Sequence, residues 1–74
     1  MTTPDPGRRA IGIAKSIHPI LAGHHPAVQG AVLADLLGMW LAGFEPDVRE
    51  ALLDAHIHAV REFVAVNAAA MGRA

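Results

Sequence analysis

The residues of this sequence best suited to chemistry are its five histidines, at positions 18, 24, 25, 56 and 58. Neutral imidazole is a common metal ligand, and histidine often acts as a general base near neutral pH. His56 and His58 form a His-x-His pair, but on a helix two such positions point about 200° apart. They would share a face only on a strand, and the surrounding residues favour a helix. We therefore expect no metal ion to be shared by this pair.

Two weaker metal-binding arrangements can be considered. Asp54 and His58 are four residues apart and would offer two ligands on one helical face, whereas a structural zinc site normally uses four. His24 and His25 stand together in a predicted turn. Neither pair is completed by cysteine, which the sequence lacks. We predict no metal and no cofactor, and we interpret His58 as a solvated side chain that pairs with its acidic neighbours Asp54 and Glu62.

The sequence offers little for catalysis. The side chains that could act as nucleophiles are Thr2, Thr3, Lys15 and Ser16. None of them belongs to a Ser–His–acid arrangement or to a glycine-rich phosphate-binding loop. The absence of cysteine also excludes a thiol nucleophile and a disulfide scaffold. We expect no enzymatic activity.

The charge balance argues against nucleic acid as a partner. Six basic and seven acidic residues give a net charge of −1, so no basic excess is present to attract phosphate. The third predicted helix begins with Asp47, Glu50 and Asp54, which would repel DNA if this were a recognition helix. We therefore expect a protein partner.

The elements that carry these residues are indicated by three prolines spaced twenty residues apart, at positions 6, 26 and 46. Proline is favoured at the first position of a helix. Gly23 and Gly43 come three residues before the second and third prolines, where a glycine with a left-handed backbone often ends a helix. The pattern predicts an all-α fold, with three antiparallel helices joined by Gly-x-x-Pro turns in a single domain over residues 1–74.

Several identities recur at the offset of twenty residues. They are Gly23/Gly43, Pro26/Pro46, Val28/Val48, Ala31/Ala51 and Leu33/Leu53. Such matches fit either a degenerate internal repeat or the same turn chemistry used twice. Shared turn chemistry is the simpler explanation, and we adopt it.

The first helix is expected over about 6–22, with Asp5 as its N-cap. Pro19 lies inside this pattern and removes one backbone donor, which predicts a kink or break near His18. Residues 1–5 are expected to be flexible, and residues 71–74 are expected to fray from the end of the third helix.

The second helix, over about 26–42, is apolar nearly all round, which is typical of a buried helix. One face carries large side chains, including Trp40. The opposite face carries small residues that would let another backbone approach closely: Ala27, Ala31, Ala34, Gly38 and Ala42. We predict that these small residues and Trp40 lie at an interface, with Asp35 as a polar group that sets its register.

The third helix, over about 46–70, has a polar stripe and an apolar arc of roughly 200°. So wide an arc indicates two packing partners. Val60 and Phe63 are the interface residues predicted on this arc. His56 and Asn67 lie on the same arc as polar residues, and we expect them to set register there, with His56 packed rather than exposed.

Size completes the prediction. A 74-residue chain buries only about 60–65% of its unfolded surface, so a lone core is marginal. Yet 53% of the residues are hydrophobic, more than one small core can hide. We expect a cytoplasmic, non-catalytic interaction module, either a homo-oligomer (most simply a homodimer) or an accessory or regulatory subunit of a larger bacterial or phage assembly. The alternatives are a histidine-based metal- or ligand-binding protein and a membrane-associated helical peptide that uses residues 26–44.

Overall fold

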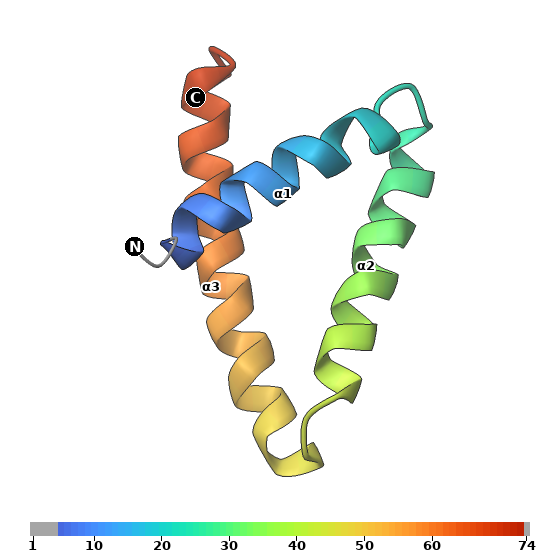
Figure 1. Cartoon of the computed structure of the whole chain (residues 1–74), viewed down its shortest axis with the longest axis vertical. Helices are drawn as coiled ribbons and strands as arrows, with labels where there is room; N and C mark the ends of the chain where they lie inside the picture. The colour runs from blue at the N-terminus through green and yellow to red at the C-terminus, as the bar shows by residue number, and fades with distance from the viewer. Residues whose placement is uncertain (1–4, 74) are drawn as a thin grey trace. The chain divides into compact units, whose positions relative to one another are not determined.

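The computed structural model describes residues 5–73 and contains three helices (Figure 1). They are α1 (Pro6–Leu21), α2 (Pro26–Ala42) and α3 (Pro46–Ala70). No strand occurs within residues 5–73, so the predicted all-α fold is confirmed, with helix boundaries within one residue of those expected. The predictions of flexibility and fraying also concern residues 1–4 and 74, which lie outside the described part of the chain.

Contacts along the chain group it into two compact units, Met1–Leu33 and Ala34–Ala74. The division falls inside α2, whose first half belongs with α1 and whose second half belongs with α3. Each unit is therefore built around one of the two Gly-x-x-Pro turns.

Each helix begins at a proline, but the preceding residue caps it differently. The Asp5 carboxylate accepts a hydrogen bond from the Gly7 N–H at 3.1 Å, as an N-cap residue should. At the start of α2 the same role falls to a histidine, because His25 Nδ1 accepts from the Ala27 N–H at 3.0 Å. Glu45, before α3, makes no capping hydrogen bond with its side chain. The capping by Asp5 was predicted from the sequence and that by His25 was not.

The two turn glycines differ in backbone conformation. Gly23 has a φ of +85°, the left-handed conformation expected after a helix end. Gly43 has no such φ, so the prediction for the second turn is wrong. There the helix tightens instead, with the Gly43 N–H donating to the Trp40 carbonyl at 3.2 Å and the Phe44 N–H to the Leu41 carbonyl at 3.0 Å. These bonds close the helix without a left-handed residue.

Proline inside α1 does not break it. The helix continues through Pro19 and ends two residues later, at Leu21, so the break that we considered near His18 is not observed. The Ala22 N–H donates to the His18 carbonyl at 3.0 Å and closes the last turn. Because Pro19 stands so close to the end, it interrupts only the final turn of the hydrogen-bond ladder.

None of residues 5–73 is buried, and this holds for α2, which we expected to be a buried helix. The best-protected side chains are half-buried. In the first unit they are Ile17, Leu21 and Gln29, and in the second Leu37, Leu41, Arg49, Leu52, Leu53, His56, Ala59 and Ala68. Neither unit, taken by itself, therefore has the closed core that normally offsets the entropy of ordering a chain.

Candidate interaction surface

In the first unit, a side chain of α2 binds the end of α1. Gln29 Nε2 donates to the Leu21 carbonyl at 2.8 Å, and the contact is partly shielded from water. The last carbonyls of a helix have no partner within it, so a donor from a neighbouring helix is stabilising there. Gln29 thus ties the start of α2 to the end of α1.

In the second unit, a side chain of α3 does the same for the end of α2. Arg49 Nε donates to the Leu41 carbonyl at 3.2 Å and to the Phe44 carbonyl at 2.9 Å. Arg49 Nη2 donates to the Ala42 carbonyl at 3.2 Å. A cation also interacts favourably with the negative end of the helix dipole. Arg49 therefore binds three backbone carbonyls at the end of α2 and in the turn that follows it, and the Leu41 carbonyl among them also accepts from the Phe44 N–H.

We call the hydrogen bonds of Gln29 and of Arg49 to the preceding helix end the two clasps. They occupy equivalent positions in the sequence, twenty residues apart. Gln29 and Arg49 each stand three residues after the helix-opening proline, and each binds a leucine carbonyl eight residues earlier. The identities at this offset also include the helix ends, at Leu21/Leu41 and Ala22/Ala42. One turn earlier, Ile17 and Leu37 are also twenty residues apart, and both are half-buried. The similarity at this offset therefore extends from the turn residues to one side-chain hydrogen bond in each unit.

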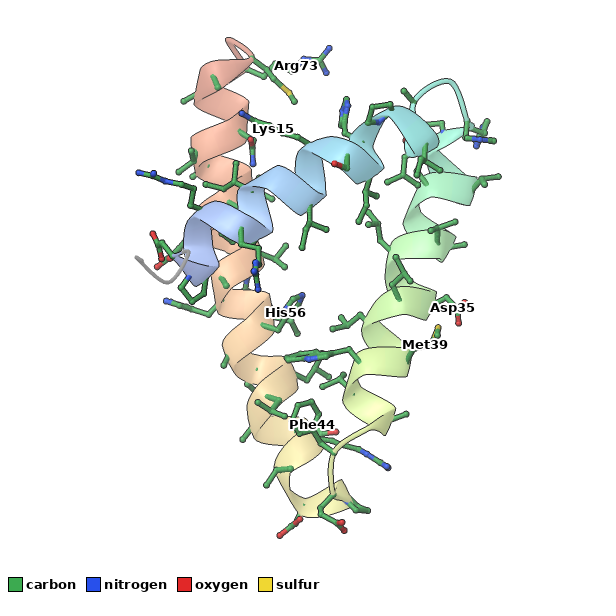
Figure 2. The ribbon with its side chains drawn as sticks, viewed as in Figure 1. Lys15, Asp35, Met39, Phe44, His56 and Arg73 are labelled. Atoms are coloured by element: carbon green, nitrogen blue, oxygen red, sulfur yellow. The ribbon has the colours of Figure 1, made fainter. Side chains whose placement is uncertain are left out.

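An aromatic cluster joins α2 and α3 within the second unit. The rings of Trp40 and Phe44 meet edge to face with centroids 5.5 Å apart, and the His56 ring lies 5.5 Å from Trp40. Figure 2 shows Phe44 and His56 pointing into the space between the two helices. Edge-to-face aromatic pairs stabilise packing beyond the area that they bury. Trp40 nevertheless stays 44% exposed, so the cluster is one side of a surface and not the centre of a core.

Large apolar side chains are exposed on all three helices. They are Ile11, Ile13 and Ile20 on α1, Val28, Val32, Leu33, Leu36, Met39 and Trp40 on α2, Phe44 in the second turn, Val48, Ile57, Val60, Phe63, Val64 and Val66 on α3, and Met71 after it. Scattered exposed apolar residues are ordinary, but extended apolar surfaces on small proteins mark sites of interaction. This set is the candidate interaction surface.

The predicted interface residues belong to this exposed part of the chain. Trp40 and Val60 are each 44% exposed and Phe63 is 63% exposed. The small residues predicted at the interface, Ala27, Ala31, Ala34, Gly38 and Ala42, are exposed as well. A Cβ built on Gly38 would meet no atom within 4 Å, so the second unit does not closely approach this residue. Their role at an interface stays a prediction.

The three polar residues expected to set register have different environments. Asp35 is exposed, and Figure 2 shows it with Met39 on the side of α2 away from α3. Asn67 Nδ2 donates to the Phe63 carbonyl of its own helix at 2.8 Å. His56 is half-buried against Trp40, close to the packed position that we expected. Among the described residues, His56 is the one of the three whose side chain contacts a residue of another helix, through the ring of Trp40.

The candidate metal ligands are not gathered into a site. His58 lies 3.5 Å from Glu62, and both side chains are largely solvated, as expected for an exposed ion-pairing face. Asp54 and His24 are exposed, and His25 caps α2. Within the described residues, no three His, Asp or Glu side chains are close enough to hold one ion.

Sequence reasoning missed the residues that hold each unit together, His25, Gln29 and Arg49. Gln29 and Arg49 left a signal, because both are hydrogen-bond donors three residues after a helix-opening proline. The role of His25 had a weaker signal. Its position before a proline is that of an N-cap, but histidine is not among the usual N-cap residues.

Comparison of the chain with known proteins provides no relative from which to infer a role, because no family model, curated protein or solved structure matches it. Among the residues described, no helix is both long enough and apolar enough to cross a membrane. The exposed apolar surface and the two clasps are therefore the features from which a function is argued.

Proposed function

We propose that this protein is a non-catalytic helical interaction module that associates with copies of itself. Its role would be to assemble, with apolar helix faces of one copy packing against those of another. The observation that carries the proposal is burial. No residue from 5 to 73 is buried, while seventeen large apolar side chains are exposed.

Counting helix faces supports a partner outside the chain. α2 is apolar nearly all round, and the apolar arc of α3 spans roughly 200°. Three helices can form at most three pairwise contacts, which give each helix two neighbours. Two neighbours do not surround α2. Further helices must therefore come from outside the chain if its apolar surface is to be covered.

A second copy is the simplest source of those helices, because most soluble oligomers are assembled from identical chains. Burying one large apolar side chain contributes about 1.5–3 kcal/mol. Association itself costs an estimated 4–15 kcal/mol. The seventeen side chains are 38–70% exposed, so covering one of them contributes roughly half of that amount. Two copies expose thirty-four such side chains, and covering about ten to twenty of them offsets even the largest of these costs. Charge does not oppose this, since the net charge is −1.

The single tryptophan makes the proposal easy to test. Trp40 is 44% exposed in one chain, so its emission reports directly on whether the surface is covered. We expect light scattering to give a mass of at least two chains at micromolar concentration, and Trp40 emission to shift to the blue as concentration rises. A folded monomer with constant emission across that range would refute self-association.

A substitution on the small-residue face refines the test. Ala34→Leu adds bulk where we predict close helix approach, and it should weaken association because the helices are pushed apart. Ala51→Leu is the matched control, because it makes the same change on the polar stripe of α3. Equal effects of the two substitutions would show that the Ala34 face is not at the interface, even if the chain is oligomeric.

A further inference from the structure

One stripe of α3 carries large apolar side chains at the spacing of a coiled coil. In that spacing, steps of four and three residues alternate, which keeps one face of a helix turned toward a neighbouring helix. The stripe, which we call the α3 seam, consists of Leu53, Ile57, Val60 and Val64. Leu53 is half-buried, and the other three side chains are each more than 40% exposed. The α3 seam is therefore suited to packing along a second helix.

Two opposite charges flank the α3 seam on one edge. Asp54 and Arg61 each follow a residue of the seam by one position, and both are exposed. The other edge belongs to α2, which half-buried His56 contacts within the second unit. Among the described residues the structure shows one ion pair, between His58 and Glu62, so neither Asp54 nor Arg61 is paired there. Both charges are therefore available to a second helix.

Two copies of the α3 seam are complementary when the helices run in opposite directions. In the antiparallel register that places Ile57 opposite Val60 of the second copy, Leu53 lies opposite Val64 of that copy. The same register places Asp54 opposite Arg61. A two-fold axis repeats every contact, so the pair of helices has four apolar layers and two reciprocal ion pairs.

Polar residues bound the apolar layers at both ends. The spacing of the seam leads back from Leu53 to Glu50 and forward from Val64 to Asn67. In the same register, Glu50 lies opposite Asn67 of the second copy. The Asn67 amide has two N–H groups and uses one on the Phe63 carbonyl, so the other can donate to the Glu50 carboxylate. The register thus sets apolar residues against apolar ones and polar residues against polar ones.

Charge disfavours the other ways of pairing the seam. Sliding the antiparallel helices by seven residues in one direction places Arg61 opposite Arg61, and sliding them in the other direction places Asp54 opposite Asp54. In a parallel pair, Arg61 would lie opposite His56. Asp54 would then lie opposite Arg49, whose guanidinium already binds three carbonyls. Both charges are satisfied in the first antiparallel register.

Charge also selects the occupant of the seam. A helix that covers it must bring an acid to Arg61 and a base to Asp54. The charged residues of α1 are all basic, and α2 has one charged residue, an aspartate. A second copy of α3 supplies both charges at the required spacing, because its own Asp54 and Arg61 flank the same seam.

We propose that two copies of this chain associate through an antiparallel pair of α3 helices, in which Asp54 of each copy binds Arg61 of the other. The α3 seam forms the apolar centre of this contact, and Glu50 and Asn67 close its two ends. This inference rests on the proposed self-association and specifies its partner surface, orientation and register.

The test reverses one charge at a time in the full chain. Asp54→Arg and Arg61→Asp each place like charges opposite each other at both ion-pair positions, so sedimentation equilibrium should show a dissociation constant raised about tenfold. An equimolar mixture of the two variants restores both ion pairs in a heterodimer, and its constant should return to within about threefold of wild type. If a single variant also loses helicity because folding depends on association, the mixture should regain it in circular dichroism.

A matched control makes the same charge changes away from the seam. Glu62→Arg and Arg73→Asp lie at exposed positions that do not flank it. Each should stay within about threefold of wild type, and mixing them should give no gain. If the wild type associates but the Asp54→Arg and Arg61→Asp mixture behaves like the control mixture, the α3 contact is wrong and self-association stands. If the wild type is a monomer at every concentration, both proposals are wrong.

Thiol cross-linking tests the orientation of the two helices. The chain has no cysteine, so Glu50→Cys and Asn67→Cys each introduce a single thiol. These two positions face each other in the antiparallel register, so a mixture of the variants should form the mixed disulfide much faster than either variant forms its own. Faster disulfide formation by either variant alone would indicate a parallel pair and overturn the inference.

Discussion

The turn at residues 22–25 and the turn at residues 43–45 share the pattern Gly-x-x-Pro, yet they are closed by different means. In the first, Gly23 takes a left-handed backbone, a glutamine binds one carbonyl and a histidine caps the next helix. In the second, Gly43 stays out of the left-handed region, an arginine binds three carbonyls and the acidic residue before the proline makes no cap. The comparison shows that a Gly-x-x-Pro turn can be closed with or without a left-handed glycine, with a side-chain donor from the following helix in both cases.

The largest expected difference in stability is between variants that remove the Arg49 clasp and variants that remove the Gln29 clasp. Arg49→Ala removes a charged donor from three carbonyls and should lower the free energy of unfolding by about 2 kcal/mol. Gln29→Ala removes one neutral bond and should cost about 1 kcal/mol. Urea unfolding of both variants at one protein concentration measures the difference. Equal losses would mean that the extra bonds of Arg49 contribute nothing.

The next largest difference in stability is expected between alanine variants of Gly23 and Gly43. Gly23→Ala forces a side chain into the left-handed region and should destabilise the protein by about 1 kcal/mol. Gly43→Ala should be close to neutral, because its backbone is permitted for alanine and the new Cβ would lie 3.4 Å from the Trp40 carbonyl oxygen. Thermal unfolding followed by circular dichroism measures both. A Gly43→Ala variant as unstable as Gly23→Ala would contradict the assigned backbone of the second turn.

The smallest effect concerns the cap of the first turn alone. His25→Ala removes the Nδ1 acceptor that binds the Ala27 N–H, and it should lower the free energy of unfolding by about 0.5 kcal/mol. His25→Asn keeps a capping acceptor and should stay close to wild type. Urea unfolding of the two variants measures the difference, and equal losses in both would refute the His25 cap.

Much of the fold could be predicted from the sequence because the residues that begin and end its helices act locally. Proline at the first helical position fixes each helix start, and Asp5 adds a standard cap, so the boundaries follow without knowledge of packing. The conformation of Gly43 could not be predicted in this way. The two turns share the glycine and the proline, so turn rules alone give both glycines the same left-handed backbone.

The sequence predicted that apolar surface would be exposed, but it did not predict the side-chain hydrogen bonds that join the helices. Composition indicated excess apolar surface, and the exposed side chains agree with that expectation. The predicted burial of α2 was wrong for a single chain because helical periodicity shows that a face is apolar without showing what covers it. The clasps were missed because Gln29 and Arg49 are polar residues on helices, which pattern analysis assigns to solvent.

The central claim is that the core of this protein forms between chains. If that is so, folding and association are coupled, and stability depends on protein concentration. The direct measurement is the thermal midpoint of the helical signal at two concentrations about a hundredfold apart. We predict that the midpoint rises clearly at the higher concentration. An identical midpoint at both, with full helical content at the lower, would show that one chain folds alone and would contradict this account.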